Sequence, residues 1–229
     1  MKRLICLLLC GLTLLSLTGC GAPKTETLDI FAMDTYMSLV AIGDGASDVL
    51  QACSNEINTL EQRLSRTIET SSVAQLNANG SAQLDDDTAA LLQAALQYSA
   101  ETGGTFDVTI APLVELWGIT GDDPRVPAQS EIDALLPLVG SGHVHLEGTA
   151  AALDEGCAID LGGIAKGYAS DKTAELFAGS GIFGGFVSLG GNVYVHGVTA
   201  EGQPWNVAIQ DPRNTEAYAC TLRLSDAFV

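Results

Sequence analysis

The sequence predicts an α+β fold in which antiparallel or mixed sheets pack against separate helices. Three long segments, 46–64, 84–102 and 164–177, carry the apolar periodicity or the end signals of helices. Short alternating apolar runs mark strands, several of which pair in hairpins. Hairpins beside separate helices are typical of α+β domains, so we expect that class.

The start of the chain is typical of an export signal. Two basic residues precede an apolar run over 4–17, which is shorter than the roughly 20 residues of a membrane-spanning helix. The ending Leu17-Thr18-Gly19-Cys20 resembles the lipobox of bacterial lipoproteins; the alternative is an ordinary secretory signal with a chance cysteine. We therefore expect a signal peptide over 1–19, lipidation of Cys20, a tether over 20–27, and a lipid-anchored protein on the cell membrane, facing the periplasm or the exterior.

The strongly negative charge of the chain argues against polyanionic partners. It carries 10 basic and 28 acidic residues, a net charge of −18, and loss of the two basic residues of the signal makes it −20. Nucleic acids and anionic membrane surfaces are bound through cationic contacts, so neither is expected. An anionic ligand such as a nucleotide would need a local device: a metal ion, a helix N-terminus or a placed lysine.

Cysteines and histidines give no strong sign of a metal site. Cys53, Cys157 and Cys220 are too few and too widely spaced for a disulfide framework or a zinc site. Burial as small apolar residues is expected, with one disulfide and one free thiol as the alternative. His143 and His145 alternate on a predicted strand without a third ligand at a sensible spacing, so they are expected to be solvated.

The predicted elements run as follows. The first half is expected to hold strands within 28–42 around a polar step at 32–35, a turn at 43–45, a helix over 46–64, a polar stretch over 65–72, a helix over 84–102 and a proline-interrupted apolar segment over 106–117. The second half is expected to hold a short helix opening with capping-box spacing at 130–133, strands over 143–146 and 157–161, a helix over 164–177, a hairpin of 186–189 with 193–196, and strands over 205–209 and from 220.

The segment Asp160–Tyr168 points most directly to chemistry. A predicted strand leads into two glycines and then a helix, whose free N–H groups attract anions. Lys166 is expected in the first turn of that helix, where a cation opposes the helix dipole unless it meets an anion such as a phosphate. An ordinary strand-to-helix turn with a surface lysine is the alternative. Neither a Walker A motif nor a dinucleotide fingerprint is present.

Two further glycine-containing segments are ambiguous when each is taken alone. Thr102–Thr109 combines two glycines, hydroxyls and a carboxylate, and is also explained as a helix end leading into a strand. Ser188–Asn192 is explained equally well as a plain hairpin turn.

Taken together and in order, the segments resemble a known family. At 105–114 and 116–118 the chain is similar to the ApbE family of FAD:protein FMN transferases. The resemblance continues through Asp160–Tyr168, Ser188–Asn192, Trp205–Ile209 and Asp211-Pro212, and includes the early Met33-Asp34-Thr35 and the helix ending at Leu64-Ser65. It covers essentially all of residues 30–229.

The resemblance implies a set of site residues. Flavin nucleotide binding is implied for Met33, Thr105, Phe106, Asp107, Asp160 and Lys166, and a backbone carbonyl ligand to Mg²⁺ for Gly163. Thr67 departs from the family pattern, since many family members carry an aromatic residue at about this position.

The resemblance also implies a reaction and its partners. Family members cleave the FAD pyrophosphate with Mg²⁺, join FMN to a threonine of a target protein and release AMP; the usual targets are subunits of membrane redox complexes. No nucleophile is required on this chain, and no catalytic side chain can be assigned. A Mg²⁺-dependent FAD pyrophosphatase and a non-catalytic flavin- or solute-binding lipoprotein remain alternatives.

One departure from the family concerns the C-terminal end. The domain expected over 28–229 lacks the last part of the family pattern, including a His-Ile-Ile-Asp-Pro-like segment and further Mg²⁺ ligands. Mg²⁺ prefers about six oxygen ligands. This 229-residue form is therefore expected to bind the metal poorly and to catalyse little.

Overall fold

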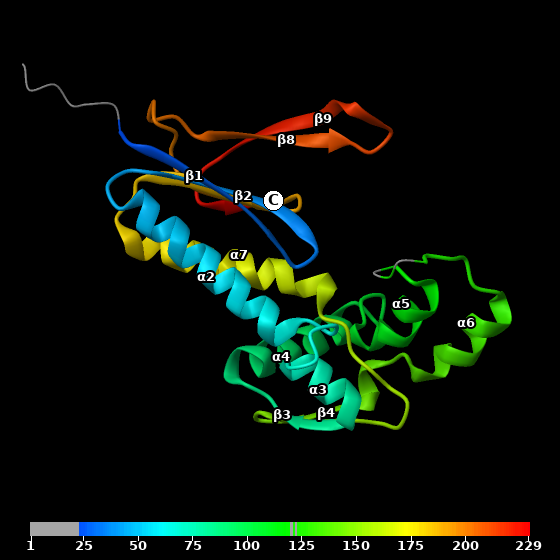
Figure 1. Cartoon of the computed structure of the whole chain (residues 1–229). Coiled ribbons are helices and arrows are strands. Elements are labelled where there is room, and N and C mark those ends of the chain that lie inside the picture. The colour runs from blue at the N-terminus through cyan, green and yellow to red at the C-terminus, as the bar shows by residue number, and fades with distance from the viewer. Residues whose placement is uncertain (1–22, 120, 122) are drawn as a thin grey trace, which may run out of the picture.

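The computed structural model describes residues 23–119, 121 and 123–229. The predicted signal peptide, the lipidated Cys20 and the first part of the tether lie outside these residues. The helices and antiparallel sheets of the described part confirm the predicted α+β class (Figure 1).

A five-stranded sheet forms one layer of the structure. Its strands are β1 (Thr25–Ala32), β2 (Thr35–Ile42), β6 (Gly184–Leu189), β7 (Asn192–Gly197) and β10 (Ala227–Phe228). They lie in the order β1-β2-β6-β7-β10, and every neighbouring pair is antiparallel. The predicted hairpin of 186–189 with 193–196 is confirmed, and the strands predicted within 28–42 form a second hairpin. Their two turns, at 33–34 and 190–191, come to the same end of the sheet because Met37 of β2 pairs with Leu189 of β6.

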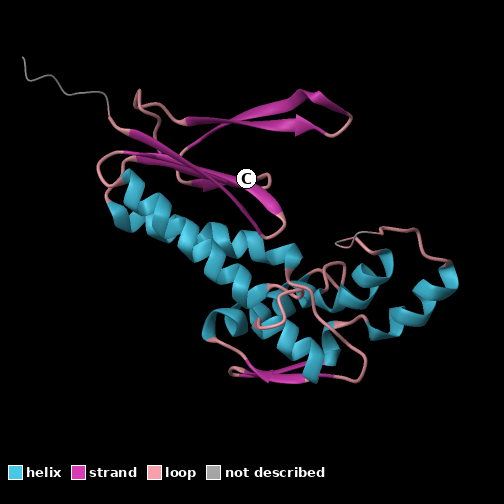
Figure 2. Cartoon of the chain, in the orientation of Figure 1, coloured by secondary structure: helices cyan, strands magenta, loops and turns pink. Residues whose placement is uncertain are grey.

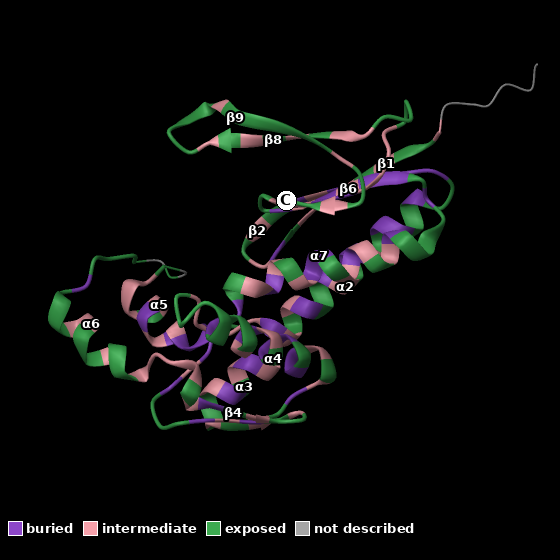
Figure 3. Ribbon diagram, turned by 180° about the vertical axis from the view of Figure 1, so that it is seen from behind, coloured by how far each residue is buried: buried purple, intermediate pink, exposed green. Residues whose placement is uncertain are grey.

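Two long helices cover one face of this sheet. Helix α2 (Ala46–Leu64) and helix α7 (Gly162–Ser180) run beneath the strands (Figure 2). Fully buried side chains of α2 meet the buried alternate residues of β2, and Phe177 of α7 is completely enclosed between them. The sheet thus packs on buried residues of both helices, which the burial colours mark along α2 and α7 (Figure 3).

A second, smaller layer lies at the C-terminal end of α2 and the N-terminal end of α7 (Figure 1). It holds α3 (Ser72–Asn79), α4 (Asp86–Glu101), α5 (Ala111–Trp117), α6 (Gln129–Leu135), three short 3-10 turns (Val108–Ile110, Leu136–Leu138 and Ser141–His143) and a three-stranded antiparallel sheet. The strands of that sheet are β3 (Ser81–Gln83), β4 (Val144–Glu147) and β5 (Ala150–Leu153), in the order β3-β5-β4. The sequence motif at 160–168 lies where the two layers meet, with Asp160 in the loop before α7 and its glycines and Lys166 in the first turns of α7.

A separate hairpin of β8 (Trp205–Asp211) and β9 (Asn214–Leu224) lies over the large sheet. The Trp205 indole N–H donates to the His196 carbonyl oxygen at 3.0 Å, and its ring packs edge-on against Phe186. This contact fixes the base of the hairpin to the sheet.

Several predicted elements were wrong in type or in bounds. Residues 157–161 join no sheet, and the Asn77 side chain bonds to the backbone of Ile159 where a neighbouring strand would. It accepts from the Ile159 N–H at 2.8 Å and donates to the Ile159 carbonyl at 2.9 Å. Helix α7 begins at Gly162, so Lys166 lies in the second turn and not the first. The apolar segment after Phe106, for which no element type was predicted, is a 3-10 turn and a helix, so the alternative of a helix end leading into a strand is wrong.

Two short helices also differ from expectation. Helix α3 was missed because it buries only Val73 and Leu76; Ser71 caps its start by accepting from the Ala74 N–H. Helix α6 begins two residues earlier than predicted, since Glu131 accepts from the Ala128 N–H at 2.8 Å. In the described part of the chain, no helix is both long and apolar enough to cross a membrane.

We predict that Gly185→Ala destabilises the junction between β6, β2 and α7. A methyl group there would overlap the Val40 carbonyl oxygen and lie 2.8 Å from Phe177 Cε2. Overpacking of this kind costs about 1–3 kcal/mol of unfolding free energy. Urea denaturation should show this loss, whereas the control Gly179→Ala, in open space on α7, should be neutral or stabilising. Equal stability of the two variants would contradict this packing.

Candidate functional site

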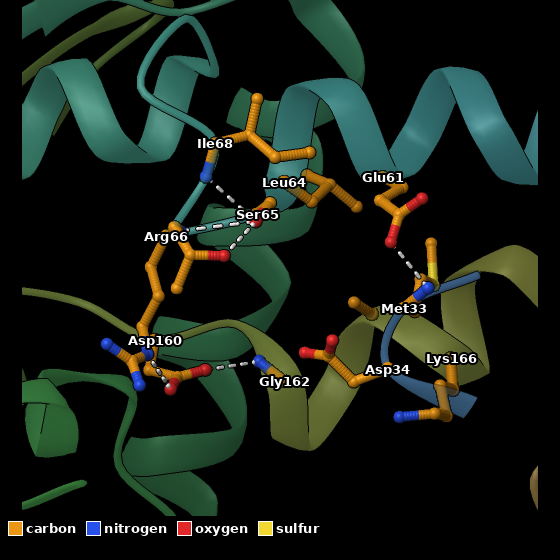
Figure 4. Close-up of a pocket in the computed structure, with 12 residues that line it drawn as sticks. Met33, Asp34, Glu61, Leu64, Ser65, Arg66, Ile68, Asp160, Gly162 and Lys166 are labelled. Carbon is orange, nitrogen blue, oxygen red and sulfur yellow. Dashed lines mark hydrogen bonds and ion pairs between the residues drawn. The ribbon is translucent and has the colours of Figure 1, made fainter. Parts of the chain in front are cut away.

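A cavity of about 390 Å³ opens between the two layers. The end of α2 and the loop after it, the β1–β2 turn and the start of α7 surround it (Figure 4). Its lining consists of Met33, Asp34, Glu61, Leu64, Ser65, Arg66, Thr67, Ile68, Asp160, Gly162, Ala165 and Lys166. Its size falls within the range usual for small-molecule sites.

An ion pair between Arg66 and Asp160 forms one wall of the cavity. Arg66 Nε lies 2.9 Å from Asp160 Oδ2, and the two side chains are only 12% and 18% exposed. The other carboxylate oxygen accepts from the Gly162 N–H at 2.7 Å. Arg66 Nη1 also reaches Glu115 at 3.3 Å. Asp160 thus joins the loop after α2 to the first turn of α7.

The backbone around Asp160 is held by the smaller layer. Its N–H donates to the Val108 carbonyl at 2.7 Å, and the Asn77 amide holds the residue before it. The loop that carries Arg66 is shaped by the Ser65 hydroxyl, which accepts from the Thr67 and Ile68 N–H groups, each at 3.2 Å. Both partners of the ion pair are therefore fixed before any ligand binds.

Lys166 brings a positive charge to the opposite wall. It lies on α7, is partly buried and lines the cavity. Among the described residues, no ion pair or hydrogen bond joins its ammonium group to another side chain. Its backbone carbonyl accepts from the Asn192 amide at 3.3 Å, which connects α7 to the β6–β7 turn. In so acidic a chain, an uncompensated lysine in a cavity indicates a site for an anion.

Met33 and Asp34 form the turn that closes the cavity from the sheet side. Both have positive φ, 49° and 54°, which is uncommon outside glycine and asparagine. The Glu61 carboxylate accepts from the Met33 N–H at 2.7 Å (Figure 4). Met33, Asp160 and Lys166, three of the residues predicted for nucleotide binding, are thus brought together around one cavity.

The other three predicted nucleotide contacts lie beside the cavity, not in its lining. Asp107 caps the 3-10 turn by accepting from the Thr109 N–H at 2.9 Å, and it accepts from the Ser99 hydroxyl at 3.1 Å. The Phe106 ring lies against Gly163, where an added Cβ would be 3.1 Å from it. Thr105 donates its hydroxyl to the Thr102 carbonyl at 3.0 Å. Their role in nucleotide binding stays a prediction.

The acidic, histidine and cysteine side chains of the described residues do not reveal the predicted magnesium site. Gly163, the predicted carbonyl ligand, lies in the first turn of α7, and no group of three or more acidic, histidine or cysteine side chains in the described ranges is arranged to hold a metal. His143 and His145 are bound by one carboxylate, Asp154, at 2.9 and 2.8 Å. The expectation that both histidines are simply solvated was therefore incomplete.

The cysteines follow the prediction in part. Cys53 and Cys157 are free and buried, and burial raises the pKa of the Cys53 thiol to about 12. Cys220 is also free but exposed. The alternative of a disulfide is excluded for these three residues in this structure.

A charged cluster behind the cavity joins three helices. Asp87, at the start of α4, accepts from the Tyr168 hydroxyl at 2.7 Å and pairs with Arg63 at 2.8 Å and Lys172 at 3.2 Å. Arg63 comes from the end of α2, and the other two partners come from α7. The Tyr168 hydrogen bond, together with the two cations, lowers the pKa of the Asp87 carboxyl. This cluster fixes α2 and α7 relative to each other near the cavity.

Sequence reasoning missed Arg66, Glu61 and Asp34 as lining residues. Arg66 follows the helix ending at Leu64-Ser65 and carries one of few positive charges in the chain, which is a usable signal. Glu61 and Asp34 are acidic residues among many, and only the fold brings them to the cavity.

The chain is similar to known proteins in both sequence and structure. The sequence profile of the ApbE family matches residues 33–229. A FAD:protein FMN transferase of Salmonella typhimurium is 30% identical over 94% of this chain and 68% of its own length. A protein of the same name from Treponema pallidum is 32% identical over 74% of this chain and 53% of its own.

Solved structures agree with the sequence matches. The ApbE protein of Thermotoga maritima superposes with a TM-score of 0.84 at 30% identity, covering 90% of this chain and 69% of that protein. The flavinyl transferase ApbE of Pseudomonas stutzeri gives 0.79 at 25% identity, covering 91% and 69%.

The fold is that of ApbE flavin transferases of known structure. The chain belongs to the ApbE family, which confirms the family predicted from the sequence motifs. It spans 68% and 63% of the length of two of its curated relatives.

We predict that Asp87→Asn lowers stability in a pH-dependent way. A lowered folded-state pKa contributes stability above the ordinary pKa of aspartate, and that contribution is lost as the pH falls through the folded value. The variant should lose about 1–3 kcal/mol of unfolding free energy at pH 7. The difference from the unsubstituted chain should shrink below about pH 4.

Urea unfolding at several pH values checks this prediction. Asp86→Asn is the matched control, because Asp86 is exposed and adjacent and its replacement makes the same change in charge. An equal loss in both variants, or a loss that does not change with pH, would contradict a specific role for Asp87.

Proposed function

We propose that this chain binds FAD in the cavity between α2 and α7 and transfers its FMN moiety to a threonine hydroxyl of a target protein, with release of AMP. Family membership supports the proposal, since relatives named FAD:protein FMN transferase match most of the chain. The observation that carries it is the placement of Lys166, a cation without a carboxylate partner among the described residues, opposite the Arg66–Asp160 pair.

The proposed chemistry requires little from the chain except binding and charge. The hydroxyl oxygen of the acceptor forms a bond to the phosphorus of the FMN half, and the bond from that phosphorus to the bridging oxygen breaks. AMP leaves with the bridging oxygen, and the hydroxyl proton is released. Phosphoryl transfer of this kind depends on positioning and on neutralisation of the phosphate oxygens. Lys166 is suited to neutralise the pyrophosphate, and the positive end of the α7 dipole adds to its effect.

Three further features belong to the proposal. Mg²⁺ would stabilise charge on the phosphates, with the Gly163 carbonyl as one ligand, although the described residues do not complete a site and no step above depends on the metal. Thr105, Phe106 and Asp107 would meet the adenosine half of FAD. Lipidation of Cys20 would hold the protein at the cell membrane, where a subunit of a membrane redox complex would supply the acceptor threonine.

A FAD pyrophosphatase is the second candidate, because the same cavity would serve with water as the nucleophile. The two candidates are separated by incubating the chain with FAD and following AMP, with and without an acceptor protein. AMP that appears only with the acceptor, together with flavin fixed to it, supports transfer. AMP and free FMN without any acceptor would instead identify a pyrophosphatase.

We predict that Lys166→Met weakens FAD binding by about 10- to 100-fold, the cost of losing one charge-assisted contact to phosphate. Calorimetric titration of FAD into the chain measures this. Lys24→Met is the control, because Lys24 is exposed and pairs with Glu26 far from the cavity. Unchanged FAD affinity in Lys166→Met, or no FAD binding by the folded unsubstituted chain, would contradict the proposal.

A further inference from the structure

We propose that Glu61 is a positioning residue that holds the Met33–Asp34 turn in the conformation needed for flavin binding. The inference rests on the proposed function and concerns the same cavity. Glu61 does not act on the substrate; it acts through the backbone of Met33. Its carboxylate accepts a hydrogen bond of 2.7 Å from the Met33 N–H, 28 residues away in the sequence.

The turn itself is unfavourable for its sequence. Met33 and Asp34 connect β1 to β2 as a two-residue hairpin loop with positive φ at both positions. Such loops favour Asn-Gly or Asp-Gly, because side chains with a Cβ are strained at positive φ. Methionine in particular has no polar side chain with which to compensate locally. An external contact is therefore needed to hold this conformation.

The turn is held from two sides. On one side the neighbouring β6–β7 turn packs so closely that a Cβ on Gly190 would overlap the Thr35 side chain. On the other side stands the Glu61 carboxylate (Figure 4). Removal of Glu61 would leave the turn supported from one side only, at the point where Met33 and Asp34 line the cavity.

The position of Glu61 on its helix supports the same inference. It lies in the last turn of α2, where a negative charge opposes the helix dipole and costs stability. Arg63, in the same turn, is the favourable kind of residue there. Glu61 is therefore poorly suited to stabilising the helix, and its contact with Met33 accounts for its presence.

The proposed role of Glu61 requires an oxygen that accepts from the Met33 N–H, and it does not require a negative charge. Glu61→Gln keeps a carbonyl oxygen that can accept the Met33 N–H, whereas Glu61→Ala removes it. We expect the alanine variant to bind FAD about tenfold more weakly and the glutamine variant to stay within about threefold of the unsubstituted chain. Glu56→Ala, which removes the same charge elsewhere on α2, should leave FAD affinity unchanged.

A second measurement does not depend on flavin. Hydrogen exchange of the Met33 amide in the ligand-free chain should be fast in Glu61→Ala and slow in Glu61→Gln. Fast exchange in Glu61→Ala would uphold the inference even if the unsubstituted chain failed to bind FAD, which would count against the proposed function instead. Slow exchange in both variants would overturn the inference.

Relief of the strain provides the final test. Asp34→Gly allows positive φ without a Cβ, so the turn should need less external support. The loss of FAD affinity on Glu61→Ala should therefore be clearly smaller in the Asp34→Gly background than in the original one. Equal losses in the two backgrounds, or a Glu61→Gln variant as impaired as Glu61→Ala, would show that Glu61 acts through its charge and not through the turn.

Discussion

The site depends on the ion pair between Arg66 and Asp160. It joins a loop of one layer to the first turn of α7, and both side chains are largely withdrawn from water. A partly buried pair of this kind is costly to desolvate and is retained only where its remaining polar atoms are satisfied. Here the second oxygen of Asp160 accepts from Gly162 and Arg66 also reaches Glu115, so further polar contacts offset part of this cost. The contacts that join these segments are therefore also the contacts that line the cavity.

Three other sets of contacts hold the remaining parts of the cavity in place. The Asp87 cluster fixes α2 and α7, the Asn77 amide fixes the loop before Asp160, and Glu61 holds the turn at Met33. Each of these contacts joins segments far apart in the sequence. The cavity lining combines two cations, Arg66 and Lys166, with three carboxylates, those of Asp34, Glu61 and Asp160. Arg66 is paired with Asp160, so Lys166 is the cation available to a phosphate-bearing ligand.

Much of the fold follows from local patterns in the sequence. Helix α2 has the predicted bounds because its buried residues recur at helical spacing, and the β6–β7 hairpin follows from alternation around Gly190 and Gly191. Residues 157–161 were wrongly expected in a sheet, because apolar alternation cannot distinguish a strand from a segment paired with a side chain such as that of Asn77. Of the site, Met33, Asp160 and Lys166 were predicted through motif resemblance, whereas Glu61 and Asp34 were not, because their place depends on tertiary structure alone.

The measurement that tests this account most directly is a double-mutant cycle on FAD affinity, with Arg66→Met, Asp160→Asn and the double variant. If the ion pair organises the cavity, each single change weakens FAD binding at least about tenfold, and the double variant is little worse than either single one, because the same contact is lost. Losses that simply multiply in the double variant, or single variants that bind FAD as well as the unsubstituted chain does, would contradict the central role of this pair.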